Sequence, residues 1–157
     1  PANFNSIGQT VIAGNAEAVR RAIPLAKTMG AKIAKLIPVS VPSHCALMQP
    51  AAEKISVDLA AITLMPPQLT VLHNVDTESH REPEVILRLL KQQLTSPVRW
   101  VETIQAMIDD YQVDTIIECG AGKVLAGLIK RIDRSAELFS IGLSVQQLHD
   151  AVEHCKN

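Results

Sequence analysis

The sequence lacks several patterns that would assign a function at once. None of its apolar runs approaches the roughly 20 residues of a membrane-spanning helix. Its formal net charge of -1 gives no reason to expect a nucleic-acid partner. Three cysteines are an odd number and have no metal-ligand spacing, so we expect free thiols in a reducing cytoplasm. The absences therefore predict a cytoplasmic protein that binds neither membrane nor nucleic acid.

The sequence also lacks the glycine motifs of nucleotide and nucleophile sites. Gly120 and Gly122 precede Lys123, but a phosphate loop needs a glycine at position 117 and Ser or Thr at position 124. Ile and Val occupy those positions, and no third glycine completes a dinucleotide fingerprint. No Gly-x-Ser-x-Gly occurs in the chain. We interpret the two glycines as a tight turn with a close helix–strand approach.

What the sequence does contain is a globular α/β pattern. The chain has 157 residues, of which 47% are hydrophobic, and this is enough for one ordinary domain. Periodicity and turn residues predict strands over residues 9–13, 32–39, 69–75, 114–119 and 137–141. Helices are predicted over residues 16–29, 46–62, 83–94, 124–132 and 145–155, with another opening at Ser96 and Pro97. Pro24 conflicts with the first helix and predicts a kink or two shorter helices. The apolar residues on both faces of 69–75 indicate a buried parallel strand.

His44 lies where an extended run passes into a helix. Pro38 and Pro42 stiffen the segment before it, and the helical pattern begins at Ala46. A helix N-terminus carries positive partial charge and disfavours imidazolium, and a neutral imidazole is what a general base requires. The alternative is an ordinary packed or capping histidine.

Gln93 is the second informative residue. It continues an apolar stripe at helical spacing that includes Ile86, Leu89 and Leu90. A primary amide facing a core needs hydrogen-bond partners, because an unpaired one costs about 1–3 kcal/mol. The alternative is that Gln93 lies at the rim of the helix or bonds backbone at its end.

Five blocks of sequence resemble the bacterial malonyl-CoA:acyl carrier protein transacylases. They follow the order and spacing of that family from the first residue to about Arg131. The block around the histidine is Val41-Pro42-Ser43-His44-Cys45-Ala46-Leu47-Met48. The other blocks are Asn3 to Gln9, Asn74-Val75-Asp76, Gln93 to Trp100 and Gly120 to Leu125.

The resemblance implies a fold and an incomplete chain. The implied fold is the C-terminal part of an α/β-hydrolase-like acyltransferase core, with parallel strands and helices, plus the back half of a ferredoxin-like small subdomain. Residues 1–38 would belong to the small subdomain and residues 39–157 to the large one. The chain starts at Pro1, and its opening resembles the middle of the family's sequence, so we expect the C-terminal half of a longer protein. Proteolysis, deliberate truncation and a nicked two-chain enzyme all remain open.

The resemblance also implies a reaction and roles for particular residues. Malonyl would pass from malonyl-CoA to the pantetheine thiol of acyl carrier protein by a ping-pong route through a malonyl-serine ester, which initiates fatty acid biosynthesis. His44 would act as the general base, and the backbone carbonyl of Gln93 would fix its tautomer. Asn5 would contact substrate, with a turn-stabilising asparagine as the alternative. Ser43, directly before His44, would also contact substrate, and its small side chain leaves room for a branched acyl group. No metal or redox cofactor is implied.

The implied partners are malonyl-CoA, acyl carrier protein and the missing N-terminal half of the same protein. That half would supply the nucleophile, so the 157-residue chain alone is expected to be inactive. Residues 1–40 carry five basic and one acidic side chain, a basic lobe that suits an acidic carrier, although a solvated face is the simpler explanation. Two other functions remain open: an acyltransferase domain of a polyketide synthase, and a non-catalytic α/β binding module of shared ancestry.

Overall fold

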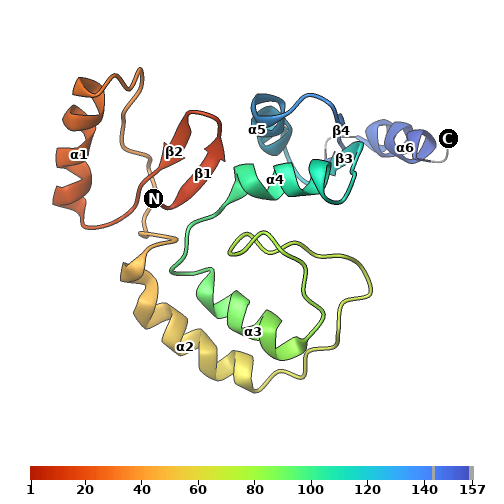
Figure 1. Ribbon diagram of the computed structural model, residues 1–157, viewed down its shortest axis with the longest axis horizontal. Coiled ribbons are helices and arrows are strands. Elements are labelled where there is room, and N and C mark those ends of the chain that lie inside the picture. The colour runs from red at the N-terminus through yellow and green to blue at the C-terminus, as the bar shows by residue number, and fades with distance from the viewer. Residues whose placement is uncertain (143, 156–157) are drawn as a thin grey trace. The chain divides into compact units, whose positions relative to one another are not determined.

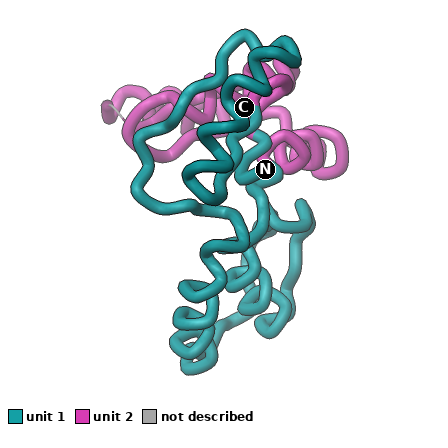
Figure 2. Tube along the Cα trace, turned by 90° about the vertical axis from the view of Figure 1, so that its left-hand side faces the viewer, with its two compact units in different colours: residues 1–4, 10–99 teal, residues 5–9, 100–157 magenta. Residues whose placement is uncertain are grey.

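A computed structural model describes residues 1–142 and 144–155 of the chain. The chain divides into two compact units, which Figure 2 colours separately. Unit 1 comprises residues 1–4 and 10–99, and unit 2 comprises residues 5–9 and 100–157. Within the described residues, no helix is both long enough and apolar enough to cross a membrane.

The N-terminal segment forms a small hairpin followed by a helix. Strands β1 (Asn3–Ser6) and β2 (Gln9–Val11) pair in a two-stranded sheet, and Gly8 takes the left-handed conformation between them at φ 76°. Helix α1 (Ala16–Thr28) begins with a side-chain N-cap: the Asn15 side chain accepts hydrogen bonds from the amides of residues 17 and 18. The helix continues through Pro24, so the alternative of two shorter helices is wrong.

Two predicted strands are not strands. Residues 32–39 and 69–75 form no β-ladder. In the second segment, Leu72 pairs with Ser79 in an isolated bridge. The backbone of the first segment instead bonds locally, from the amide of Val39 to the carbonyl of Ile37 at 2.8 Å. A strand needs a neighbour for its donors and acceptors, and no described part of the chain pairs along the length of either segment. Alternating apolar residues alone were therefore a misleading signal.

Two packed helices in unit 1 hold the segment that contains His44. A short 3-10 turn, η1 (Ala46–Met48), leads into α2 (Gln49–Ala60), which packs against α3 (Pro83–Gln92), as Figure 1 shows. Ala52 of α2 and Leu89 of α3 are buried, at 1% and 3% exposed. Ile86 is also buried, as the predicted apolar stripe requires.

Unit 2 contains a parallel strand–helix–strand unit. Strands β3 (Thr115–Glu118) and β4 (Glu137–Ser140) pair in parallel, with Thr115 opposite Glu137, and α5 (Val124–Ile132) connects them. Helices α4 (Trp100–Asp109) and α6 (Val145–His154) complete the unit, and Ile104 and Ile129 are its fully buried large side chains. The mixed α/β class with parallel strands is confirmed.

The start of α4 differs from the prediction. Pro97 does not open that helix, which begins at Trp100. The backbone of Val98 is instead extended beside the N-terminal strand: its amide bonds the carbonyl of Ala2 at 2.8 Å, and its carbonyl accepts from the amide of Phe4 at 2.9 Å. These long-range hydrogen bonds outweigh the local capping signal.

The glycine turn before α5 approaches backbone that follows β4, and not a helix and a strand as predicted: a Cβ at Gly120 or Gly122 would meet nothing within 4 Å. Gly120 and Gly122 have φ values of 154° and 108°, and a Cβ at Gly142 would lie 1.6 Å from the carbonyl oxygen of Gly120. The carboxylate of Glu118 then accepts from the amides of Leu125 at 3.1 Å and Ala126 at 2.9 Å. The Glu118 carboxylate thus occupies the anion-binding position at the N-terminus of α5. This agrees with the sequence, which does not have the residue spacing of a phosphate loop.

Candidate active site

His44 has an unusual backbone conformation. Its φ is 60°, in the left-handed region that non-glycine residues rarely adopt. The flanking loop supports this conformation: the amide of Ser43 bonds the carbonyl of Val41 at 2.9 Å, and the thiol of Cys45 contacts the carbonyl of Pro42 at 3.1 Å. Residues held in such conformations concentrate at active sites and ligand-binding turns. The loop therefore holds the imidazole in a defined orientation.

The His44 ring contacts the end of α3. Its Nδ1 atom lies 2.9 Å from the backbone carbonyl oxygen of Gln93. A carbonyl oxygen can only accept, so Nδ1 carries the hydrogen and donates it. In the neutral ring, Nε2 then keeps its lone pair and can accept a proton. His44 is half-buried, so the ring is neither sealed in the core nor fully solvated.

Gln93 acts in this contact through its backbone. It is the C-cap residue of α3, and its side chain is exposed. The amide therefore lies at the rim of the helix and not in the core, because the helix ends at Gln92, one residue before the apolar stripe would include it. The hydrogen bond that the family resemblance implied between the histidine ring and this carbonyl is present.

The helix end that contacts the ring also differs from the expectation. The 3-10 turn that follows His44 is three residues long, whereas the carbonyl that meets Nδ1 belongs to the C-terminus of α3. Carbonyls at a helix C-terminus lack intrahelical donors and carry partial negative charge, so they are good acceptors for an imidazole N–H.

The two expected substrate-contacting residues lie in different units. Ser43 is half-buried and directly precedes His44 in unit 1. Asn5 is half-buried in β1 and belongs to unit 2. Their proposed contacts with substrate stay predictions.

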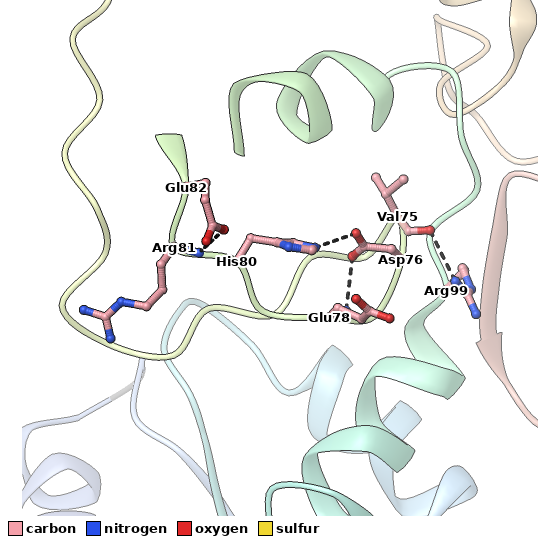
Figure 3. A network of polar contacts seen from close by, with 7 residues as sticks. All are labelled: Val75, Asp76, Glu78, His80, Arg81, Glu82 and Arg99. Atoms are coloured by element: carbon pink, nitrogen blue, oxygen red, sulfur yellow. Dashed lines mark hydrogen bonds and ion pairs between the residues drawn. The ribbon is translucent and has the colours of Figure 1, made fainter. Parts of the chain in front are cut away.

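A second polar cluster in unit 1 was missed by the sequence reasoning (Figure 3). The Nε2 atom of His80 lies 2.8 Å from Oδ2 of Asp76, and Oδ1 of Asp76 accepts from the amide of Glu78 at 3.1 Å. The ring of His73 is tilted against that of His80 at 5.8 Å between centroids. His80 therefore has defined partners and is half-buried, although it lies in a polar loop. The spacing of Asp76 and His80, four residues apart, was the available signal.

This cluster orders the loop that leads into α3. Partial burial raises the pKa of Asp76, but the Glu78 amide, the hydrogen bond from His80 and the charges of His80 and His73 outweigh it, so the pKa lies below its usual value. Arg99 extends the network by donating to the carbonyls of Asn74 and Val75. Over the described residues, no three His, Cys, Asp or Glu side chains are placed to hold a metal ion.

Several known proteins are similar to this chain. The transacylases named malonyl CoA-acyl carrier protein transacylase from Salmonella typhimurium and Haemophilus influenzae are each 50% identical to it, over 132 and 139 residues. These alignments cover 84% and 88% of this chain but 42% and 44% of the relatives. The chain thus spans less than half the length of these curated relatives.

Solved structures give the same result for the fold. The malonyl CoA-acyl carrier protein transacylase of Coxiella burnetii has a TM-score of 0.95 and 50% identity, covering 100% of this chain and 49% of that one. A malonyl-transacylase solved in complex with a type II PKS acyl-carrier protein has a TM-score of 0.94 and 45% identity, covering 98% and 49%. This likeness confirms the expected fold, part of an α/β-hydrolase-like acyltransferase core with part of a ferredoxin-like subdomain. Because residues 1–151 also match the family model of the acyl transferase domain, the chain belongs to the acyl transferase domain family.

Proposed function

We propose that this chain is the C-terminal half of a malonyl-CoA:acyl carrier protein transacylase and supplies its general base, His44. The observation that supports this most directly is the 2.9 Å contact between Nδ1 of His44 and the Gln93 carbonyl, which leaves Nε2 as the proton acceptor. A serine from the N-terminal half would be the nucleophile, in the arrangement of a serine–histidine pair oriented by a third group.

The first half-reaction forms a malonyl-serine ester. Nε2 of His44 takes the serine hydroxyl proton while the serine oxygen attacks the thioester carbonyl of malonyl-CoA. As the carbon–sulfur bond breaks, the imidazolium returns that proton to the departing CoA sulfur. The Gln93 carbonyl keeps the ring oriented and stabilises the charged ring through its hydrogen bond with Nδ1–H.

The second half-reaction repeats these steps with a new thiol. CoA leaves, and Nε2 of His44 takes the proton of the pantetheine thiol on the acyl carrier protein. The thiolate attacks the ester, and the serine oxygen recovers the proton as it departs. This is a ping-pong sequence that needs no metal or redox cofactor, because both steps are acyl and proton transfers.

Exposed apolar surface on this chain supports the proposal that an N-terminal half of the protein packs against it. Val39 and Val41, beside His44, are 62% and 51% exposed. Within the described residues the parallel sheet of unit 2 has two strands, whereas parallel sheets normally have several strands and helices over both faces. We propose that the N-terminal half covers these surfaces, that residues 1–38 belong to a small subdomain and 39–157 to a large one, and that Asn5 and Ser43 contact substrate.

We also propose the setting in which the whole protein works. The partners would be malonyl-CoA and an acyl carrier protein, the pathway fatty acid biosynthesis and the location the cytoplasm. One solved relative is a malonyl-transacylase in complex with an acyl-carrier protein, which supports the carrier as a partner.

Replacing His44 in the full-length protein tests the proposal. The variant H44A should lower the rate of malonyl transfer by several orders of magnitude, because the members of such a nucleophile–base unit act together. The matched control is H149A, since His149 is an exposed histidine of α6, and this variant should keep most of the activity. Transfer by H44A at a near-normal rate would remove His44 from its role.

A further inference from the structure

The carbonyl that meets His44 is the next acceptor in the hydrogen-bond ladder of α3. The preceding carbonyl, that of Gln92, accepts from the amide of Ser96 at 3.1 Å, which is an ordinary bond between residues four apart. The same carbonyl also accepts from the amide and the hydroxyl of Thr95, at 3.1 and 3.2 Å. The i,i+4 hydrogen-bond pattern of the helix therefore continues as far as the carbonyl of Gln92.

The next bond of this ladder cannot form. It would join the Gln93 carbonyl to the amide of residue 97, and that residue is proline, which has no N–H. The carbonyl is thus left without its helical donor at the end of α3, and the Nδ1–H of His44 takes that place at 2.9 Å.

We propose that Pro97 is a positioning residue for the reaction: because it has no N–H to donate four residues after Gln93, it leaves the Gln93 carbonyl available to His44. The expected loss of malonyl transfer rests on the proposed function, whereas the expected change in the His44 tautomer does not. In the proposed reaction, Pro97 touches no reacting atom. It acts through the backbone of Gln93, whose side chain is exposed.

A new amide at position 97 would compete for the carbonyl. A carbonyl has two lone pairs and can accept two donors, but accepting a helical donor turns the oxygen along the helix axis and lengthens the bond from the ring. The neutral imidazole would then lose its preference for the Nδ1–H form. Fewer molecules would present Nε2 as the base.

The test compares P97A with P83A in the full-length protein. Pro83 is at the start of the same helix, where the missing N–H would have no intrahelical partner in any case, so P83A matches the loss of a proline without adding a competing donor. The ¹⁵N chemical shifts of the His44 ring report the tautomer, and malonyl transfer is measured in parallel. We expect wild type and P83A to hold Nδ1–H, and P97A to shift toward Nε2–H with about a tenfold lower kcat/KM, equivalent to about one hydrogen bond.

The outcomes separate this inference from the proposed function. An unchanged tautomer in P97A, with turnover within about twofold of wild type, overturns the role of Pro97. A shifted tautomer together with near-normal turnover in H44A supports the positioning and refutes the general-base function. If P97A does not fold, P97S provides the same donor; and an Nε2–H ring in the wild-type spectrum, which needs no variant, also overturns the inference.

Discussion

Replacing Glu118 by glutamine tests how the turn between β3 and α5 is held. The two carboxylate oxygens accept from the amides of Leu125 and Ala126, at 3.1 and 2.9 Å, and Glu118 is half-buried. Those amides are in the first turn of α5, where they have no intrahelical acceptor. The variant E118Q keeps the shape of the side chain but removes its charge and one of its two acceptors.

The expected loss can be estimated from the two contacts. A hydrogen bond to a charged group contributes about 1.5–3 kcal/mol, and a negative charge at a helix N-terminus adds about 0.3–1 kcal/mol. Glutamine retains one neutral bond of about 0.5–1.5 kcal/mol, so the net loss over the two contacts should be at least about 2 kcal/mol. Because each 1.36 kcal/mol is a factor of ten, this corresponds to about 30-fold faster exchange of the protected amides.

Hydrogen exchange of the Leu125 and Ala126 amides in the full-length protein is the measurement. The control is E84Q, since Glu84 is an exposed carboxylate in the first turn of α3. We expect little change in that variant. Exchange in E118Q within about threefold of wild type would show that the carboxylate does not hold this helix end.

Two further predictions concern unit 1. The variant Q93A should keep at least about a third of the malonyl-transfer activity, because Gln93 acts through its carbonyl and its side chain is exposed; a hundredfold loss would assign the amide a role of its own. The variant D76N should be less stable than wild type to thermal denaturation at pH 7. Since the pKa of Asp76 is lowered in the folded state, this difference should be present above about pH 4 and disappear as pH falls through the lowered pKa; a gap that is constant down to pH 2 would contradict the charge-based explanation.

Local signals predicted the regular elements that local chemistry can complete. Helix α1 lies within its predicted range, and α5 follows the predicted glycine turn. These features depend on hydrogen bonds and dihedral preferences within a few residues, so a single sequence contains the information. The predicted strands at 32–39 and 69–75 failed for the converse reason, because a strand also depends on backbone elsewhere in the molecule.

The candidate site shows the same division. Residue types and family resemblance predicted His44 and Gln93 as site residues, and with them a class of chemistry, from the sequence alone. Only the tertiary structure joined them across 49 residues and brought Asp76, His80 and His73 together. The physical reason is that a sequence specifies which groups can donate or accept, whereas chain packing decides which acceptor is left free and which donor reaches it.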